Sequence, residues 1–149
     1  ALAPVGAWIA VRGSLALLPM LLGFAVLVWA AGFDMLYALQ DEAFDRKAGL
    51  NSLPARWGAR RTLAASAVLH AVMLPLLYAA WRLAGGGLLF AAGIVATGAA
   101  LVYQHAIVRP RDLSRLDAAF FTANGFVSVT LALCGIGDVL LRQTPPPGR

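Results

Sequence analysis

Residues 15–47 read LALLPMLLGFAVLVWAAGFDMLYALQDEAFDRK, an apolar run that passes directly into charged side chains. Its first part, residues 15–38, is long enough to cross a bilayer as a helix, because about 20 apolar residues span the hydrocarbon core. The carboxylates Asp41, Glu42 and Asp45 follow, and Asp34 lies just before them. Burying ionisable groups at membrane depth costs free energy, so those that occur near a membrane span usually have a function. This stretch therefore indicates both a membrane fold and a candidate site.

Three further apolar runs follow, at residues 62–81, 88–108 and 116–141. The chain is 60% hydrophobic and only 13% charged, whereas about 25% of the residues of a soluble domain are charged. We therefore predict an all-α integral membrane protein with four full transmembrane helices, forming one transmembrane domain over residues 1–149.

The ends of the chain differ from the spans. Residues 2–11 form an apolar segment that is too short to cross a bilayer, and we interpret it as an N-terminal stub, the end of a preceding helix. Residues 143–149 read QTPPPGR, and we predict that they form a disordered tail. A polar loop is expected between the first two spans, at residues 40–61.

The net charge of +5 is interpreted as a topology signal, so we predict no nucleic-acid partner. The side that holds residues 40–61 carries eight basic residues and the opposite side four, which places the acidic segment in the cytoplasm. The eight are Arg46, Lys47, Arg56, Arg60, Arg61, Arg109, Arg111 and Arg115, and the four are Arg12, Arg82, Arg142 and Arg149.

The acidic segment, residues 34–47, has the spacing of a metal site. Asp34, Asp41 and Asp45 are spaced i, i+7 and i+11, so a continuous helix would place all three on one face, with Tyr37 beside them. Carboxylates stacked in this way repel one another unless a cation lies between them. Mg²⁺ held by one or two carboxylates and by substrate phosphates is the commonest such arrangement.

Two cations follow the acidic face directly, Arg46 and Lys47. Basic side chains beside a carboxylate-bound metal suit a diphosphate, whose remaining charge they neutralise. Because the site borders a membrane, a lipid diphosphate is the predicted ligand. A salt-bridged loop without a ligand is the alternative interpretation.

Tyr37, Asp41 and Asp45 form the pattern YxxxDxxxD, which resembles the second aspartate-rich motif of the UbiA superfamily of intramembrane aromatic prenyltransferases. The string GFDMLYALQDEAFDRKAGLNSLPARWG at residues 32–58 looks most like the 4-hydroxybenzoate polyprenyltransferases. Residues 103–125, YQHAIVRPRDLSRLDAAFFTANG, also resemble the C-terminal region of that family.

The resemblance implies a bundle of nine transmembrane helices with two facing aspartate-rich motifs. The first motif of the family, NxxxDxxxD, does not occur in this sequence. The chain therefore resembles the C-terminal half of the bundle, and we expect it to be inactive by itself. A bacterial inner membrane location is the expectation that follows.

The implied reaction transfers a polyprenyl group from a polyprenyl diphosphate to an aromatic acceptor such as 4-hydroxybenzoate, in quinone biosynthesis of the ubiquinone or menaquinone type. By this resemblance Asp41 and Asp45 would be catalytic Mg²⁺ ligands and Tyr37 would line the cavity near the allylic cation. Lys47 and Arg46 would bind phosphate, and Asp34 is a further substrate-binding candidate.

Two alternatives remain open from the sequence. The acceptor could be homogentisate, dihydroxynaphthoate or a haem vinyl group, within the same superfamily. The chain could instead be a non-catalytic membrane subunit or cation carrier, which Mg²⁺-dependent binding of a diphosphate would separate from a prenyltransferase. His70, in the second span, is expected to make a hydrogen bond between helices.

Overall fold

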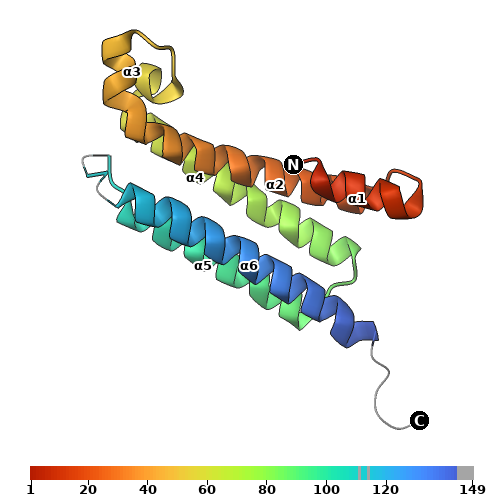
Figure 1. Cartoon of the computed structure of the whole chain (residues 1–149). Coiled ribbons are helices and arrows are strands. Elements are labelled where there is room, and N and C mark those ends of the chain that lie inside the picture. Colours follow the sequence, from red (N-terminus) through yellow and green to blue (C-terminus); the bar gives the residue numbers. More distant parts are fainter. Residues whose placement is uncertain (111, 114, 144–149) are drawn as a thin grey trace, which may run out of the picture.

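The computed structural model describes residues 1–110, 112–113 and 115–143, and these are almost entirely helical (Figure 1). No β-strand forms within this part of the chain, so the predicted all-α class is confirmed. Six α-helices and one 3₁₀ helix follow one another: α1 (Ala3–Arg12), α2 (Leu17–Tyr37), η1 (Ala38–Asp41), α3 (Glu42–Ala48), α4 (Leu53–Leu83), α5 (Leu88–Ile107) and α6 (Leu116–Gln143).

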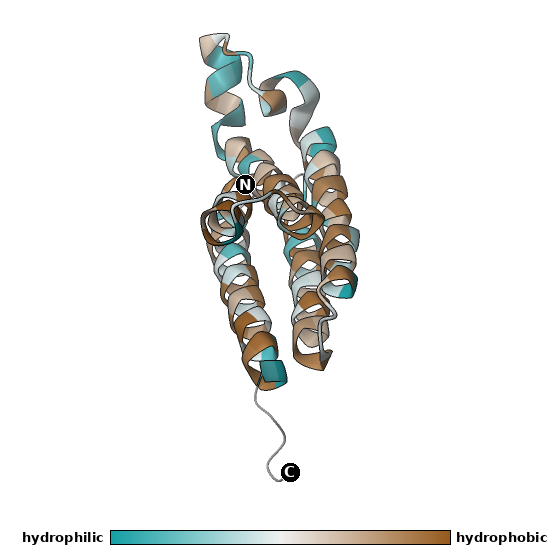
Figure 2. Cartoon of the chain, turned by 90° about the vertical axis from the view of Figure 1, so that its right-hand side faces the viewer, coloured by the Kyte–Doolittle hydropathy of each residue, from teal (hydrophilic) through white to brown (hydrophobic). Residues whose placement is uncertain are grey.

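Four helical stretches are long and apolar enough to cross a membrane, as the sequence predicted: Leu17–Ala48, Leu53–Leu83, Leu88–Ile107 and Phe120–Gln143. Between 11% and 33% of their apolar windows is buried inside the chain. Most of their surface therefore faces outward, where only lipid or other apolar protein would cover it without cost. In Figure 2 hydrophobic residues dominate the long helices, and hydrophilic residues gather around α3.

The long helices pack as two antiparallel pairs. The largest contacts join α2 to α4 and α5 to α6, with smaller contacts between α4 and α5 and between α2 and α6. Figure 1 shows the pairs side by side, with η1 and α3 projecting beyond the end of α2. The short α1 lies against the first turns of α2. The stub predicted at residues 2–11 is thus helical, and it is packed on the bundle.

The predicted polar loop at residues 40–61 is wrong over most of its length. η1 and α3 occupy residues 38–48, and α4 begins at Leu53. The Ser52 hydroxyl accepts a hydrogen bond from the backbone N–H of Ala55 at 3.3 Å, which caps the start of α4. Gly58 then leaves helical geometry, with φ 77° and ψ 162°, so the first turns of α4 form a separate short helix. A left-handed φ of this kind favours glycine.

A group of polar contacts closes the end of the bundle remote from α3. The Asp138 carboxylate accepts hydrogen bonds from the backbone N–H groups of Gly87 at 2.8 Å and Phe90 at 3.2 Å, and so caps α5 from the neighbouring helix. Arg142 forms an ion pair with Asp138 at 3.0 Å and donates to the carbonyls of Ala84 and Gly85. We call this group the Asp138 cluster.

The C-terminal segment is partly described. Gln143 is the last residue of α6, so the predicted tail starts one residue later at the earliest. Residues 144–149 lie outside the described part of the chain.

Candidate functional site

The segment η1–α3 carries most of the predicted site residues, continues directly from α2 and packs on α4. α3 ends at Ala48 and is followed by Gly49, whose φ of 67° is left-handed, and the backbone N–H of Leu50 bonds to the carbonyl of Asp45 at 2.9 Å. These are the features of a helix that terminates in a tight turn. The turn leads the chain back to α4, so α3 packs against the start of α4.

The continuous helix expected from Asp34 to Asp45 is interrupted. Residues 38–41 form a 3₁₀ helix, which has three residues per turn and therefore advances about 20° more per residue than an α-helix. Over four residues this rotates the following helix by about 80°. The three aspartates consequently do not form one stripe, and no group of three His, Cys, Asp or Glu residues suited to a metal ion occurs in the described part of the chain.

The three aspartates differ in their surroundings. Asp34 and Asp41 are exposed, whereas Asp45 keeps only 9% of its surface accessible. Within the described residues, no hydrogen bond or ion pair reaches the Asp45 carboxylate. Its carboxylate oxygens are not among the buried unpaired side-chain atoms of the described chain, so they keep access to solvent or to a ligand. Asp45 is thus a mostly buried residue whose carboxylate has no protein partner among the described residues and is available to a cation.

The two cations that follow Asp45 are both exposed. Arg46 pairs with Glu42 one turn earlier, at 2.8 Å. Its side chain is 56% exposed, so the pair contributes little to stability and Arg46 is available to a ligand. The Arg46 guanidinium also lies 3.6 Å from the position that a Cβ on Gly58 would take, so it reaches across to the break in α4.

Tyr37 connects the site to α6. Its ring lies 4.9 Å from that of Phe120, and Phe120 in turn packs on Phe33 at 5.8 Å. Gln40 donates a hydrogen bond from Nε2 to Oδ1 of Asp117, near the start of α6. The end of α2, η1 and the start of α6 are therefore one contiguous corner of the bundle, although residues 40 and 117 are far apart in the chain.

The aromatic row continues into the bundle at His70. Its ring lies 4.7 Å from that of Phe33, and its Nδ1 lies 3.0 Å from Nε2 of His105. The Nε2 of His70 lies 3.3 Å from the carbonyl oxygen of Trp29. Because a carbonyl only accepts, His70 donates from Nε2, and in a neutral ring its Nδ1 then accepts from His105. The predicted hydrogen bond between helices at His70 is confirmed.

Sequence reasoning missed several residues of this framework. Phe33, Phe120 and Gln40 carry no signal that would place them beside Tyr37, because their contacts join distant segments. Asp138 did carry a signal, since an ionisable residue inside an apolar span is rare and usually has a task.

Comparison with known proteins shows which family and which individual proteins this chain resembles. The model of the UbiA prenyltransferase family matches residues 1–128. The chain is 32% identical over 121 residues to the 4-hydroxybenzoate octaprenyltransferase of Aromatoleum aromaticum, which covers 81% of this chain and 40% of that protein.

Proteins of the same name from other bacteria show similar sequence identity and coverage. Identity is 33% over 118 residues to the enzyme of the same name from Cronobacter sakazakii, covering 79% of this chain and 40% of the relative. It is 31% over 134 residues to that of Xanthomonas euvesicatoria pv. vesicatoria, covering 87% and 44%. No solved structure matches this chain.

The chain thus spans about 40% of the length of these curated relatives. The family model nevertheless extends over most of the chain and includes the whole of η1–α3, the four long helices in part or in full, and the corner at Tyr37. This chain therefore belongs to the UbiA prenyltransferase family.

Proposed function

We propose that this chain supplies the diphosphate-binding half of a membrane prenyltransferase. The reaction transfers a polyprenyl group from a polyprenyl diphosphate to an aromatic acceptor such as 4-hydroxybenzoate, in quinone biosynthesis at the bacterial inner membrane. The observation that supports the proposal is the order of side chains on α3: Asp45, mostly buried and with no carboxylate partner among the described residues, is followed directly by exposed Arg46 and Lys47.

The carboxylates of this segment could hold Mg²⁺ in one arrangement. Mg²⁺ is usually held by one or two carboxylates, with phosphate oxygens and waters completing its shell. Asp45 and Asp41 would be those carboxylates. Since no third carboxylate or histidine of the described chain joins them in a metal-sized group, the diphosphate itself would provide further oxygens. Bound Mg²⁺ would neutralise charge on the diphosphate as it leaves.

The side chains of this half then have separate tasks. Arg46 exchanges its surface pair with Glu42 for a phosphate oxygen, because a guanidinium binds phosphate in a bidentate manner. Lys47 adds a second positive charge. Tyr37, whose ring packs against Phe120, lies beside the allylic carbon as its bond to the diphosphate oxygen breaks. Its aromatic face stabilises the cation that forms there. Asp34, exposed two turns before Asp41, borders the same end of the bundle.

The chemistry balances without a redox partner. The bond between the allylic carbon and the diphosphate oxygen breaks, and the electron pair leaves with diphosphate. A ring carbon of the acceptor forms the new carbon–carbon bond, and the ring then loses one proton. Electrostatic stabilisation of the departing diphosphate is the main task assigned to residues 34–47.

Binding of a labelled farnesyl diphosphate to the purified chain tests the proposal. We expect binding that requires Mg²⁺ and that falls about tenfold or more in Asp45→Asn, since a ligand charge is lost. Asp112→Asn, which changes a carboxylate of the α5–α6 connection, is the matched control and should bind as the wild type does. Binding without Mg²⁺ dependence would instead favour a non-catalytic membrane subunit.

A further inference from the structure

Two residues of α6 contact the end of α2 and η1 at matching positions. Asp117 Oδ1 accepts a hydrogen bond from Gln40 Nε2, and the ring of Phe120 lies 4.9 Å from that of Tyr37. Tyr37 and Gln40 are three residues apart in the chain, and so are Asp117 and Phe120. The order is reversed between the two helices, as antiparallel packing requires. We call these four residues the corner contact.

The Phe120 ring is held in place by a second aromatic contact. It packs edge-on against Phe33, with the ring centroids 5.8 Å apart. Phe33 lies one turn before Tyr37 on α2 and is only 2% exposed. Phe120 therefore contacts two successive rings of α2, one buried and one, Tyr37, that is 45% exposed. The Tyr37 ring is thus supported on one side and remains accessible on the other.

The corner contact accounts for the 3₁₀ helix at residues 38–41. Ala38, Leu39 and Gln40 are all of types that form α-helices well, and a 3₁₀ helix has the poorer hydrogen bonds. Side chains three residues apart share one azimuth in a 3₁₀ helix, whereas in an α-helix they are about 60° apart. The 3₁₀ turn therefore brings Gln40 into line with Tyr37 on the side of α6. A contact outside the segment thus favours a twist that its own sequence does not.

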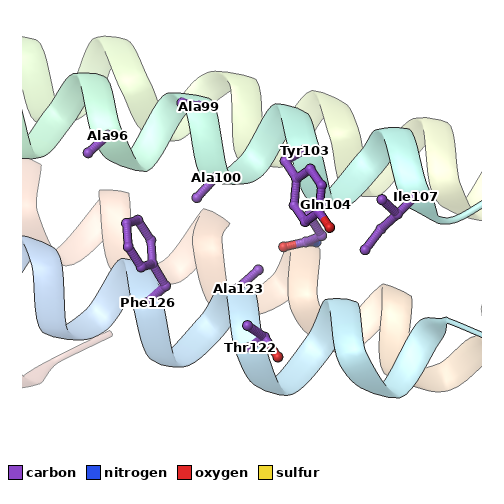
Figure 3. A pocket seen from close by; sticks show the side chains of 9 residues that line it. All are labelled: Ala96, Ala99, Ala100, Tyr103, Gln104, Ile107, Thr122, Ala123 and Phe126. Carbon is purple, nitrogen blue, oxygen red and sulfur yellow. The ribbon is translucent and has the colours of Figure 1, made fainter.

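Helix α6 is itself supported from another side. α5 and α6 form one of the two main helix pairs, and a cavity of about 470 Å³ lies between them. Figure 3 shows Ala123 and Phe126 on the side of α6 that faces α5. Among the described residues that line this cavity, neither Asp117 nor Phe120 occurs. The corner contact is therefore made by a helix that α5 holds through other residues.

We propose that Asp117 and Phe120 are positioning residues of the candidate site. Phe120 sets the orientation of the Tyr37 ring. Asp117, through Gln40, sets the twist of η1. Because Asp41 is the last residue of η1 and α3 begins at the next residue, this twist also sets the direction of the Asp41 carboxylate and of α3. That the site then binds Mg²⁺ and a diphosphate rests on the proposed function, whereas the positioning itself does not.

Fluorine NMR of the ligand-free chain tests the contact with Tyr37. The chain has three tyrosines, so labelling with 3-fluorotyrosine gives few signals, and Tyr37→Phe identifies the relevant one. We expect Phe120→Leu to shift the Tyr37 signal, because the ring current of Phe120 is lost, and to leave that of Tyr78 on α4 unchanged. Phe126→Leu, the same change on the side of α6 toward α5, is the matched control and should leave the Tyr37 signal in place.

Two results would overturn this part of the proposal. An unchanged Tyr37 signal in Phe120→Leu would show that the two rings are not in contact. Equal shifts of the Tyr37 and Tyr78 signals would assign Phe120 to folding of the whole bundle and not to positioning.

Distances between spin labels test the twist of η1. Ala30 of α2 and Ala48 of α3 are exposed, so labelled cysteines at both positions, in a Cys134→Ala background, report how α3 continues from α2. Asp117→Asn keeps an oxygen that accepts from Gln40, and its distance distribution should match that of the wild type. Asp117→Leu has a similar size but no acceptor, so we expect a shifted or broader distribution. Identical distributions in the two variants would show that Asp117 does not position η1.

Ligand binding separates this inference from the proposed function. With labelled farnesyl diphosphate and Mg²⁺, Asp117→Leu should bind about fivefold more weakly than Asp117→Asn, which corresponds to one net hydrogen bond. Equal binding by the two variants would show that the twist of η1 does not matter to the site. If the wild type itself does not bind, the proposed function fails, and the fluorine and spin-label results decide whether Asp117 and Phe120 position Tyr37 and η1.

Discussion

His70 lies directly against the bare Cα of Gly32. A Cβ added at residue 32 would lie 2.5 Å from both Cδ2 and Nε2 of the imidazole, a distance that carbon atoms in proteins do not adopt. The same glycine accepts a hydrogen bond at its carbonyl from Ser66 Oγ at 2.7 Å. Helices α2 and α4 therefore approach as closely as their backbones allow at this point, as is typical of membrane helices with small residues at their interface.

Gly32→Ala is predicted to destabilise the bundle. The added methyl group would push His70 away from Trp29 and His105, and overpacking of this kind costs about 1–3 kcal/mol. Thermal unfolding in detergent, followed by circular dichroism, measures the change. Gly125→Ala in α6 is the control, because no atom lies within 4 Å of its added Cβ. A Gly32→Ala melting temperature equal to that of the control would contradict the close contact.

The metal-site prediction concerns activity in a complete bundle. We consider a chimera in which the N-terminal part of the homologous protein from Aromatoleum aromaticum is fused to the start of this chain. In it, Asp41→Ala or Asp45→Ala should each lower prenyl transfer by about 10²–10³, because the diphosphate charge loses an electrostatic partner. Asp112→Ala should have little effect. If all three variants kept similar rates with a labelled diphosphate, residues 41 and 45 would have no role in catalysis.

The topology prediction places η1–α3 in the cytoplasm. The basis is the excess of basic residues on that side of the membrane. In a Cys134→Ala background, cysteines at Ala48 and Leu88, both exposed, should react with a membrane-impermeant maleimide from opposite sides. We expect Leu88→Cys to be labelled in intact cells and Ala48→Cys only after lysis. Labelling of both from the same side would rule out the arrangement.

The fourth prediction is that this chain alone does not turn over substrate. It contains one aspartate-rich motif, and Mg²⁺ held by two carboxylates would fill its remaining positions with water and hold the diphosphate weakly. The measurement compares prenyl transfer to 4-hydroxybenzoate by the purified chain with and without the co-expressed N-terminal half of a relative. Turnover by the chain alone at the rate of the pair would show that a single motif suffices.

The sequence predicts the membrane spans well, because long apolar runs have few other solutions. The apolar pattern predicts that the second span begins at Thr62, nine residues after the observed start of α4 at Leu53. Arg56, Arg60 and Arg61 lower the hydropathy there, yet Ser52 and Pro54 supply the helix start. The sequence therefore contains local signals for a helix start, although its polar composition there favours a loop.

The geometry of the candidate site is harder to predict. Spacing alone placed Asp34, Asp41 and Asp45 on one face, and this assumed that α2 continues as an α-helix. The 3₁₀ turn at residues 38–41 changes the azimuth, and no residue in ALQD forbids an α-helix. The contact of Tyr37 with Phe120 and the burial of Asp45 depend on how α3 and α6 fold back, which is tertiary information.

The Asp138 cluster has a consequence for the order in which the bundle assembles during synthesis. Each of the two main pairs, α2 with α4 and α5 with α6, is formed by neighbours in the sequence, so each can associate soon after it leaves the ribosome. Helix α5 begins at Leu88, and Gly87 before it supplies no side-chain cap. The N–H groups of Gly87 and Phe90 acquire their partner only when Asp138, 51 residues after Gly87, has been made. The final turns of α6 therefore complete α5, and a ribosome that stalls before residue 138 leaves a helix whose start lacks these partners inside the membrane.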